Sequence, residues 1–212
     1  KTQPLPEQFQ DDRQNVLVSI WRNRGQQDTA LAWLESQPQT ASTLNLRGEI
    51  LQNQHNDAAV EDVMTHLLSL APDNNEARRA LVQAYLRQGQ FEKAVENANN
   101  LRDGPQKQAI LQELRIKWIA ASAPDASLVN QWLDNALDPK NREQLWRAYA
   151  TALSRQPDGD KKALAWLETV KGEHDITALR RERAVWAEKL DAWHTIVAEL
   201  APMAKTNTLS PT

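Results

Sequence analysis

Four histidines are the side chains best suited to bind a metal ion or to act as a general base near neutral pH: His55, His66, His174 and His194. No two of them are four residues apart, and the sequence contains no HExxH motif. A metal site or a general base needs converging partners, which these spacings do not supply. The chain also has no cysteine, which removes disulfides, thiolate ligands and cysteine nucleophiles. We therefore expect no metal and no cofactor.

Paired carboxylates occur at Glu61–Asp62 and at Asp158 and Asp160. They fall at expected helix starts or turns, where a favourable interaction with the helix N-terminus explains them. The six glycines are scattered singly, so the sequence offers no phosphate loop, dinucleotide fingerprint or nucleophile elbow. Some lytic transglycosylases have a helical-solenoid body, but such enzymes carry a separate catalytic domain that does not fit here. We expect that the chain is not an enzyme.

The charge balance bears on the class of partner. The chain carries 25 Lys and Arg against 28 Asp and Glu, for a net charge of −3. Nucleic-acid binding normally requires a basic excess, and the local excess over 140–190 is small and interleaved with acids. No apolar run approaches the roughly 20 residues that span a bilayer. We expect neither nucleic-acid binding nor direct membrane insertion of this segment.

Helical periodicity runs through the chain. Val16, Leu17, Ile20 and Trp21 form an apolar stripe at helical spacing, and Gly or Pro separates this stripe from the next. The alternation predicts about six helical hairpins, the last ending before Pro202. After a first hairpin over 13–38, the expected pairs are 43–53 with 58–70, 76–88 with 91–101, 108–121 with 127–137, 144–155 with 161–170, and 176–190 with 192–200.

One hexapeptide occurs twice. ALAWLE stands at 30–35 and again at 163–168, each time in the expected second helix of a hairpin and after a turn that contains Gly and Asp. Six identical residues in equivalent places indicate repeated units, and stacked units of this size are typical of solenoids.

The stretch 41–108 resembles two consecutive tetratricopeptide repeats, 41–74 and 75–108. The first carries Leu44, Gly48, Leu51 and Pro72 in the family's register, and the second carries Leu81, Tyr85, Gly89, Phe91, Ala94 and Ala98. His55 falls in the turn position that Gly89 takes in the next repeat. Small residues at 94 and 98 allow two helices to approach closely, and Leu81 and Tyr85 fill the groove between them.

The resemblance implies an all-α fold, a right-handed α-solenoid of about six antiparallel helix hairpins. We expect this TPR-like helical repeat domain to occupy 13–203, between flexible tails at 1–12 and 204–212. Outside 41–108 the match degrades, and the alternative is a non-repeat helical bundle that contains one such hairpin by convergence.

In this family the first helix of each repeat lines the inner groove. The register of 41–108 therefore implies a partner-binding surface, in which Arg79 and Arg87 would pair a partner carboxylate. The family's carboxylate clamp is not expected, because Leu46 and Glu49 occupy its positions. The implied partner-binding residues are Asn45, Glu49, Gln52, Arg79, Gln83, Leu86 and Arg87.

These observations predict a protein–protein interaction scaffold or adaptor, in a bacterial multi-protein or envelope complex, whose partner is another polypeptide. The alternative is a periplasmic repeat region of a larger exporter or assembly protein, such as a polysaccharide secretion system, which the eight tryptophans favour. We expect most tryptophans to pack between helices instead. The thiol-free, Gln- and Asn-rich composition and the start at Lys1 favour a periplasmic or envelope location over a cytoplasmic one.

Overall fold

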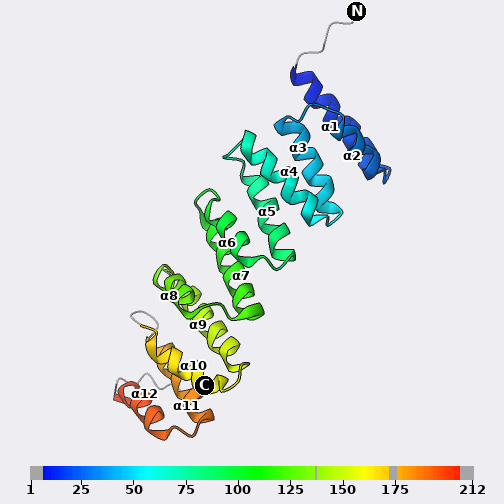
Figure 1. Ribbon diagram of the computed structural model, residues 1–212. Helices are drawn as coiled ribbons and strands as arrows, with labels where there is room; N and C mark the ends of the chain where they lie inside the picture. Colours follow the sequence, from blue (N-terminus) through cyan, green and yellow to red (C-terminus); the bar gives the residue numbers. More distant parts are fainter. Residues whose placement is uncertain (1–6, 137, 172–175, 206–212) are drawn as a thin grey trace, which may run out of the picture. The chain divides into compact units, whose positions relative to one another are not determined.

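A computed structural model describes residues 7–136, 138–171 and 176–205 of the chain, and over these residues it contains helices and no strand (Figure 1). The all-α prediction is confirmed. The helices are α1 (Glu7–Asn23), α2 (Gln27–Glu35), α3 (Ala41–Asn53), α4 (Asp57–Leu70), α5 (Asn75–Arg87), α6 (Phe91–Asn99), α7 (Pro105–Ser122), α8 (Ala126–Asp134), α9 (Pro139–Ser154), α10 (Gly159–Thr169), α11 (Ile176–Lys189) and α12 (Trp193–Lys205).

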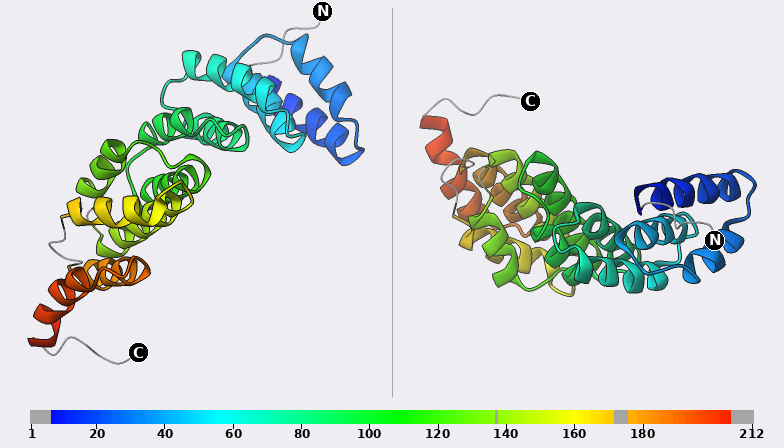
Figure 2. Two further views of the ribbon diagram at one scale, coloured as in Figure 1. Left: turned by 60° about the horizontal axis from the view of Figure 1, so that its bottom comes forward. Right: turned by 90° about the horizontal axis from the view of Figure 1, so that it is seen from above.

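The chain forms two compact units, unit 1 (Lys1–Leu111) and unit 2 (Gln112–Thr212), whose boundary falls within α7. In unit 1 each helix from α1 to α6 packs on the next, and α3 also packs on α1 and on α5. In unit 2 the helices from α8 to α12 pack in the same chain order, and α9 also contacts α11 (Figure 2). Some helices that are separated by one other helix along the chain therefore also contact each other within each unit. The single domain expected over 13–203 comprises two compact units.

Several helices begin earlier than the sequence predicted, and two of them begin with a proline. α7 starts at Pro105 and α9 at Pro139, where Asp138 caps the helix by accepting a hydrogen bond from the Lys140 N–H. Proline suits the first helical position because the N–H that it lacks has no partner there in any helix. The sequence predicts these prolines as breaks between helices, and the structure makes each the first residue of the following helix.

Both ends of the chain also depart from the predicted boundaries. α12 continues through Pro202 to Lys205, so the expected stop before this proline is wrong. Met203, directly after it, is buried. α1 begins at Glu7, so part of the expected tail at 1–12 is helical. Residues 1–6 and 206–212 of the expected tails lie outside the described residues.

Four turns share one geometry. Gly25, His55, Gly89 and Asp191 each have a positive φ, between 54° and 71°, two residues before the next helix begins. In each turn the following residue donates its N–H to the carbonyl five residues earlier, as Asn56 does to Leu51 (3.0 Å) and Gln90 to Tyr85 (2.8 Å). This pattern closes the end of a helix with a left-handed residue. The prediction that His55 takes the position of Gly89 is confirmed.

Replacing Gly89 with alanine should lower the free energy of unfolding by about 1–2 kcal/mol, because any side chain strains the left-handed backbone there. A Cβ at this position would meet no heavy atom within 4 Å, so steric crowding does not contribute. Chemical denaturation measures the loss. The matched change His55→Gly should stabilise the chain, and a neutral Gly89→Ala together with a destabilising His55→Gly would contradict this explanation.

The two ALAWLE hexapeptides agree in burial at four positions, while Leu31 and Trp33 are only partly buried and their counterparts Leu164 and Trp166 are buried. Ala30 and Leu34 in α2 are 0% exposed, as are Ala163 and Leu167 in α10. The second alanine and the glutamate are exposed in both copies. The two segments therefore present the same face to the core of their unit, as the duplication predicted.

The small and large residues of 75–108 pack as expected. Ala94 and Ala98 in α6 are 0% exposed, and Leu81 and Tyr85 in α5 are buried. The Tyr85 hydroxyl donates a hydrogen bond to the Glu61 carboxylate of α4 at 3.0 Å. Tyr85 thus links α4 and α5, and its burial and the negative charge of Glu61 raise its pKa to about 12.

The titration of Tyr85 tests this arrangement. In a Tyr149→Phe variant, which leaves Tyr85 as the single tyrosine, phenolate absorbance should appear with a midpoint near pH 12. Glu61→Gln should lower that midpoint. The folded state holds the Tyr85 hydroxyl proton more tightly than the unfolded state does. The stability contributed by this protonated hydroxyl is therefore complete below the ordinary pKa of 10.0 and is lost as the pH rises toward 12. A midpoint near pH 10 in the folded protein would show that Tyr85 is not packed in this way.

Candidate binding surface of unit 1

Two adjoining cavities lie on unit 1. The α3–α5 cavity, of about 360 Å³, and the α5–α7 cavity, of about 500 Å³, share Asn74, Glu76 and Arg79. The α3–α5 cavity is further lined by Asn45, Glu49, Gln52, Met64, Ala80 and Gln83. The α5–α7 cavity is further lined by Asp73, Asn75, Leu101, Arg102, Asp103, Gly104, Pro105, Gln106, Lys107 and Ile110.

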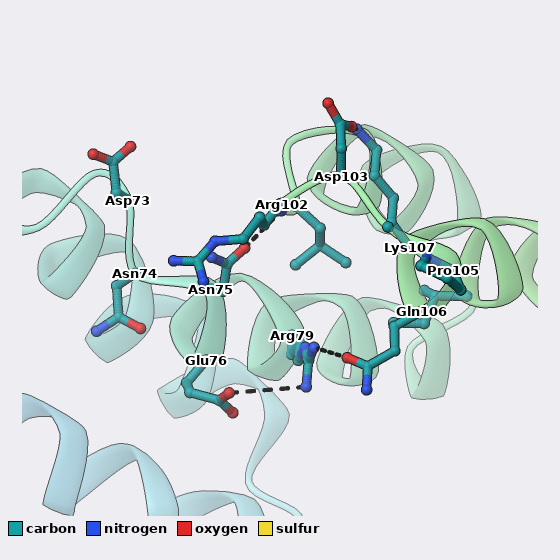
Figure 3. Close-up of a pocket in the computed structure, with 13 residues that line it drawn as sticks. Asp73, Asn74, Asn75, Glu76, Arg79, Arg102, Asp103, Pro105, Gln106 and Lys107 are labelled. Carbon is teal, nitrogen blue, oxygen red and sulfur yellow. Dashed lines mark hydrogen bonds and ion pairs between the residues drawn. The ribbon is translucent and has the colours of Figure 1, made fainter.

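Helix caps fix the elements that carry these residues. The Asn74 side chain accepts a hydrogen bond from the Ala77 N–H (3.0 Å) and so sets the start of α5. The Arg102 N–H donates to the Asn75 side chain (2.8 Å), which ties the loop before α7 to that start (Figure 3). The sequence therefore places the first turn of α5 at the centre of the surface.

The charged groups on this surface are largely paired with one another. Arg79 lies 3.8 Å from the Glu76 carboxylate and donates to the Gln106 side-chain oxygen at 2.5 Å (Figure 3). Lys107 contacts the Asp103 carboxylate at 2.8 Å, and its hydrogen bond and positive charge lower the pKa of Asp103. The surface thus presents both signs of charge in close alternation.

A third pair neutralises the far end of the α3–α5 cavity, where Glu49 meets Arg22 of α1 at 2.9 Å. Asp73 and Arg102 make no ion pair with another residue that the structure describes, and their charges oppose each other. The surface therefore carries little net charge with which to select a strongly charged ligand.

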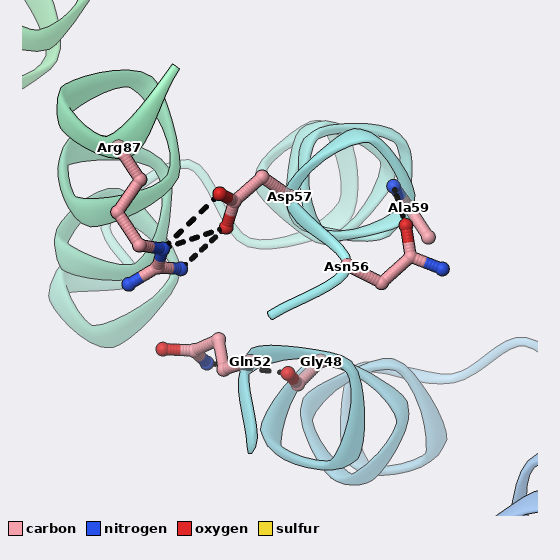
Figure 4. Close-up of polar contacts among 6 residues, drawn as sticks. All are labelled: Gly48, Gln52, Asn56, Asp57, Ala59 and Arg87. Carbon is pink, nitrogen blue, oxygen red and sulfur yellow. Dashed lines mark hydrogen bonds and ion pairs between the residues drawn. The ribbon is translucent and has the colours of Figure 1, made fainter. Parts of the chain in front are cut away.

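Five of the seven predicted partner-binding residues come together in the α3–α5 cavity, namely Asn45, Glu49, Gln52, Arg79 and Gln83. Leu86 and Arg87 line neither of the two cavities. The Arg87 guanidinium instead binds the Asp57 carboxylate at the start of α4, with Nε 2.9 Å and 3.1 Å from its two oxygens (Figure 4). The structure does not bring Arg87 to Arg79, so these two arginines do not form the expected carboxylate-binding pair.

The α5–α7 cavity was not predicted as a site, although Arg79, one of its lining residues, was among the predicted partner-binding residues. Asn75, Gln106 and Lys107 were not predicted, because α7 was expected to begin at 108 and α5 at 76. An early helix start carried these three side chains onto the surface.

Within the part of the chain that the structure describes, no three His, Cys, Asp or Glu side chains gather in a way that could hold a metal ion. His55, His66 and His194 are exposed, and His174 lies outside that part. The same described residues include no helix whose length and apolarity would let it cross a membrane.

The tryptophans mainly belong to the cores. Trp132, Trp146, Trp166 and Trp186 are buried, while Trp21 and Trp33 pack against each other with ring centroids 5.4 Å apart. Trp118 packs against Trp132 at the same separation, with the two rings tilted by 54°. Trp193 differs, because 64% of it is exposed at the start of α12. No tryptophan lines either cavity of unit 1.

No protein-family model matches this sequence, and no curated protein is significantly similar to it. The resemblance to tetratricopeptide repeats therefore rests on the residues of 41–108 themselves. The role of the surface must be inferred from its geometry and chemistry.

Proposed function

We propose that this chain is an interaction scaffold or adaptor, and that the surface formed by the two cavities of unit 1 binds another polypeptide. The fold proposed with it is a TPR-like, right-handed α-solenoid of about six antiparallel hairpins. The observation that carries the proposal is that five groove residues expected from the register of 41–108 line one cavity, which adjoins a second.

The packing order supports the solenoid. α3 contacts both α1 and α5, and α9 contacts α11, as the first helices of successive hairpins would. The recurring left-handed turn before α2, α4, α6 and α12 gives those hairpins a common geometry. In such an array the first helices lie in one layer, and α3 and α5 carry most of the α3–α5 cavity.

The size and chemistry of the surface support a polypeptide ligand. Each cavity has the volume of a site for a small molecule, but the lining mixes polar and apolar groups, and Asn74, Glu76 and Arg79 belong to both cavities. An elongated ligand with many hydrogen-bonding groups would use both cavities at once. Charged and amide side chains stand beside Met64, Ala80, Leu101 and Ile110 in the two linings, so a purely apolar ligand would leave those polar groups without partners.

Two adjacent arginines supply the test. A displayed library of random peptides would be selected on the whole chain, and the affinities of the selected peptides measured for wild type, Arg79→Ala and Arg78→Ala. Arg79 lines both cavities, whereas Arg78 lines neither and donates to the Pro72 carbonyl. We expect Arg79→Ala to weaken binding about ten-fold or more, as loss of a charged hydrogen-bond donor does.

Arg78→Ala should change the affinity less than about three-fold, because Arg78 lines neither cavity. Failure to select any peptide, or selected peptides that bind Arg79→Ala as tightly as wild type, would contradict the proposed function. Circular dichroism of both variants establishes that they remain folded.

A further inference from the structure

Two exposed apolar side chains of α1 hold positions that are buried in the next hairpin. Counted from the left-handed residue that follows each first helix, Val16 and Ile20 lie nine and five residues before Gly25. They are 57% and 41% exposed, and together they form the α1 face. Leu46 and Ile50 have the same two positions in α3, and both are buried.

The packing of α3 shows what side chains at these positions contact. Leu46 and Ile50 share one core cluster with three residues of the preceding hairpin, Val18, Ala30 and Leu34. These positions of a first helix therefore pack on the hairpin before it. The α1 face is thus one half of a hairpin-to-hairpin contact, and it is exposed to solvent.

The other half of the same contact is exposed on α12. Val197 lies six residues after the left-handed residue of its hairpin, as Leu31 does in the first hairpin. Leu31 packs against the cluster that joins α2 to α3, and Leu164, its match in the second ALAWLE, is buried. Val197 is 64% exposed, as is Trp193 one turn before it, and these two residues form the α12 face.

Inside unit 1, ion pairs accompany the contact between a second helix and the first helix that follows it. Arg47 of α3 lies 3.1 Å from the Glu35 carboxylate of α2. Arg87 of α5 binds Asp57 of α4 in the corresponding way. A partner that met only one side of such a contact would leave an arginine or a carboxylate without its counter-ion.

Neither exposed face carries these charges. At the positions of the two arginines, α1 has Leu17 and Asn23. At the positions of the two carboxylates, α12 has Ala201 and Trp193. Both sides of both pairs are therefore uncharged together, so the α1 face and the α12 face match each other in charge as well as in position.

We infer that the α1 face of one molecule packs on the α12 face of a second copy of this chain, which gives head-to-tail self-association. Burial of the four exposed apolar side chains drives this contact. Because the two faces differ, the contact is heterologous, and each bound molecule keeps one free face. No residue of either face lines the two cavities of unit 1, so this surface is separate from the proposed peptide site.

Sedimentation equilibrium of the whole chain tests the inference. Wild type should self-associate with a dissociation constant of about 10–100 µM, because a contact of this size lies at the small end of specific interfaces. The α1 variant, Val16→Lys with Ile20→Lys, and the α12 variant, Trp193→Lys with Val197→Lys, should each associate at least about ten-fold more weakly. A lysine ammonium in the contact would lose water without gaining a partner.

Mixing the two variants gives the sharper result. The α1 variant keeps an intact α12 face, and the α12 variant keeps an intact α1 face. An equimolar mixture should therefore form complexes of two chains and no larger species. Ser19→Lys is the matched control, because Ser19 holds the position of the exposed groove residues Glu49 and Gln83, and it should leave self-association within about three-fold of wild type.

Three outcomes would overturn the inference. They are a wild type that stays monomeric up to about 500 µM, a mixture of the two variants that stays monomeric, and an α1 variant that still dimerises by itself. The last result would assign the α12 face to a symmetric contact between two α12 helices. Circular dichroism establishes that the variants are folded, and the single changes Val16→Lys and Val197→Lys repeat the test should a double variant unfold.

Discussion

Replacing Trp146 with alanine should lower the free energy of unfolding by about 3–5 kcal/mol, the largest single effect expected in this chain. Trp146 in α9 is 0% exposed and belongs to the core cluster of unit 2, with residues such as Ile119, Leu133 and Leu167. Removing the indole takes away a large buried apolar surface and leaves a cavity that the helices can only partly fill.

Urea denaturation followed by far-ultraviolet circular dichroism measures this loss. Tryptophan fluorescence is less suitable, because the substitution removes one of the reporting side chains. Trp193→Ala is the matched control, since 64% of Trp193 is exposed, and its effect should stay below about 1 kcal/mol. Equal effects of the two substitutions would show that Trp146 is not the centre of this core.

Leu34→Ala and Leu167→Ala should each lower the free energy of unfolding by about 2–5 kcal/mol. The two leucines hold the same place in the duplicated ALAWLE, and both are 0% exposed, in α2 and α10. The first belongs to the core of unit 1 with Val18, Leu46 and Ile50, and the second to the core of unit 2. Two similar losses would therefore arise in two different cores.

Controls for this pair come from the same hexapeptides. Ala32 and Ala165 are exposed in both copies, so Ala32→Ser and Ala165→Ser should stay within about 0.5 kcal/mol of wild type. Chemical denaturation of the four variants gives the comparison. A large loss in one copy with tolerance in the other would contradict the equivalence of the two segments.

Most of the helical architecture could be predicted because apolar periodicity and turn residues are local signals. The burial of Ala94 and Ala98 and the left-handed turn at His55 followed from the register of 41–108. Prolines were ambiguous, since Pro105 and Pro139 start helices and Pro202 lies within one. The division into two units gave no signal, because α7 keeps its helical pattern across the boundary.

The candidate surface was predictable to the extent that it follows the helical register. Asn45, Glu49 and Gln52 lie on one face of α3, and Arg79 and Gln83 follow on α5. Arg87 was predicted to bind the partner, but its side chain binds Asp57, thirty residues away in sequence. No local sequence pattern encodes that ion pair. Gln106 and Lys107 were missed because they depend on where α7 begins.

Site-specific photo-crosslinking tests the central claim, that the cavities of unit 1 bind a polypeptide, most directly. A benzophenone amino acid would be placed at Gln83, which lines the α3–α5 cavity, or at Glu92, which is exposed on α6 outside both cavities. Irradiation with a selected peptide should crosslink efficiently from position 83, with competition by the unlabelled peptide, and only at background level from position 92. Equal crosslinking from both positions, or none from position 83 with a peptide that binds, would contradict the claim.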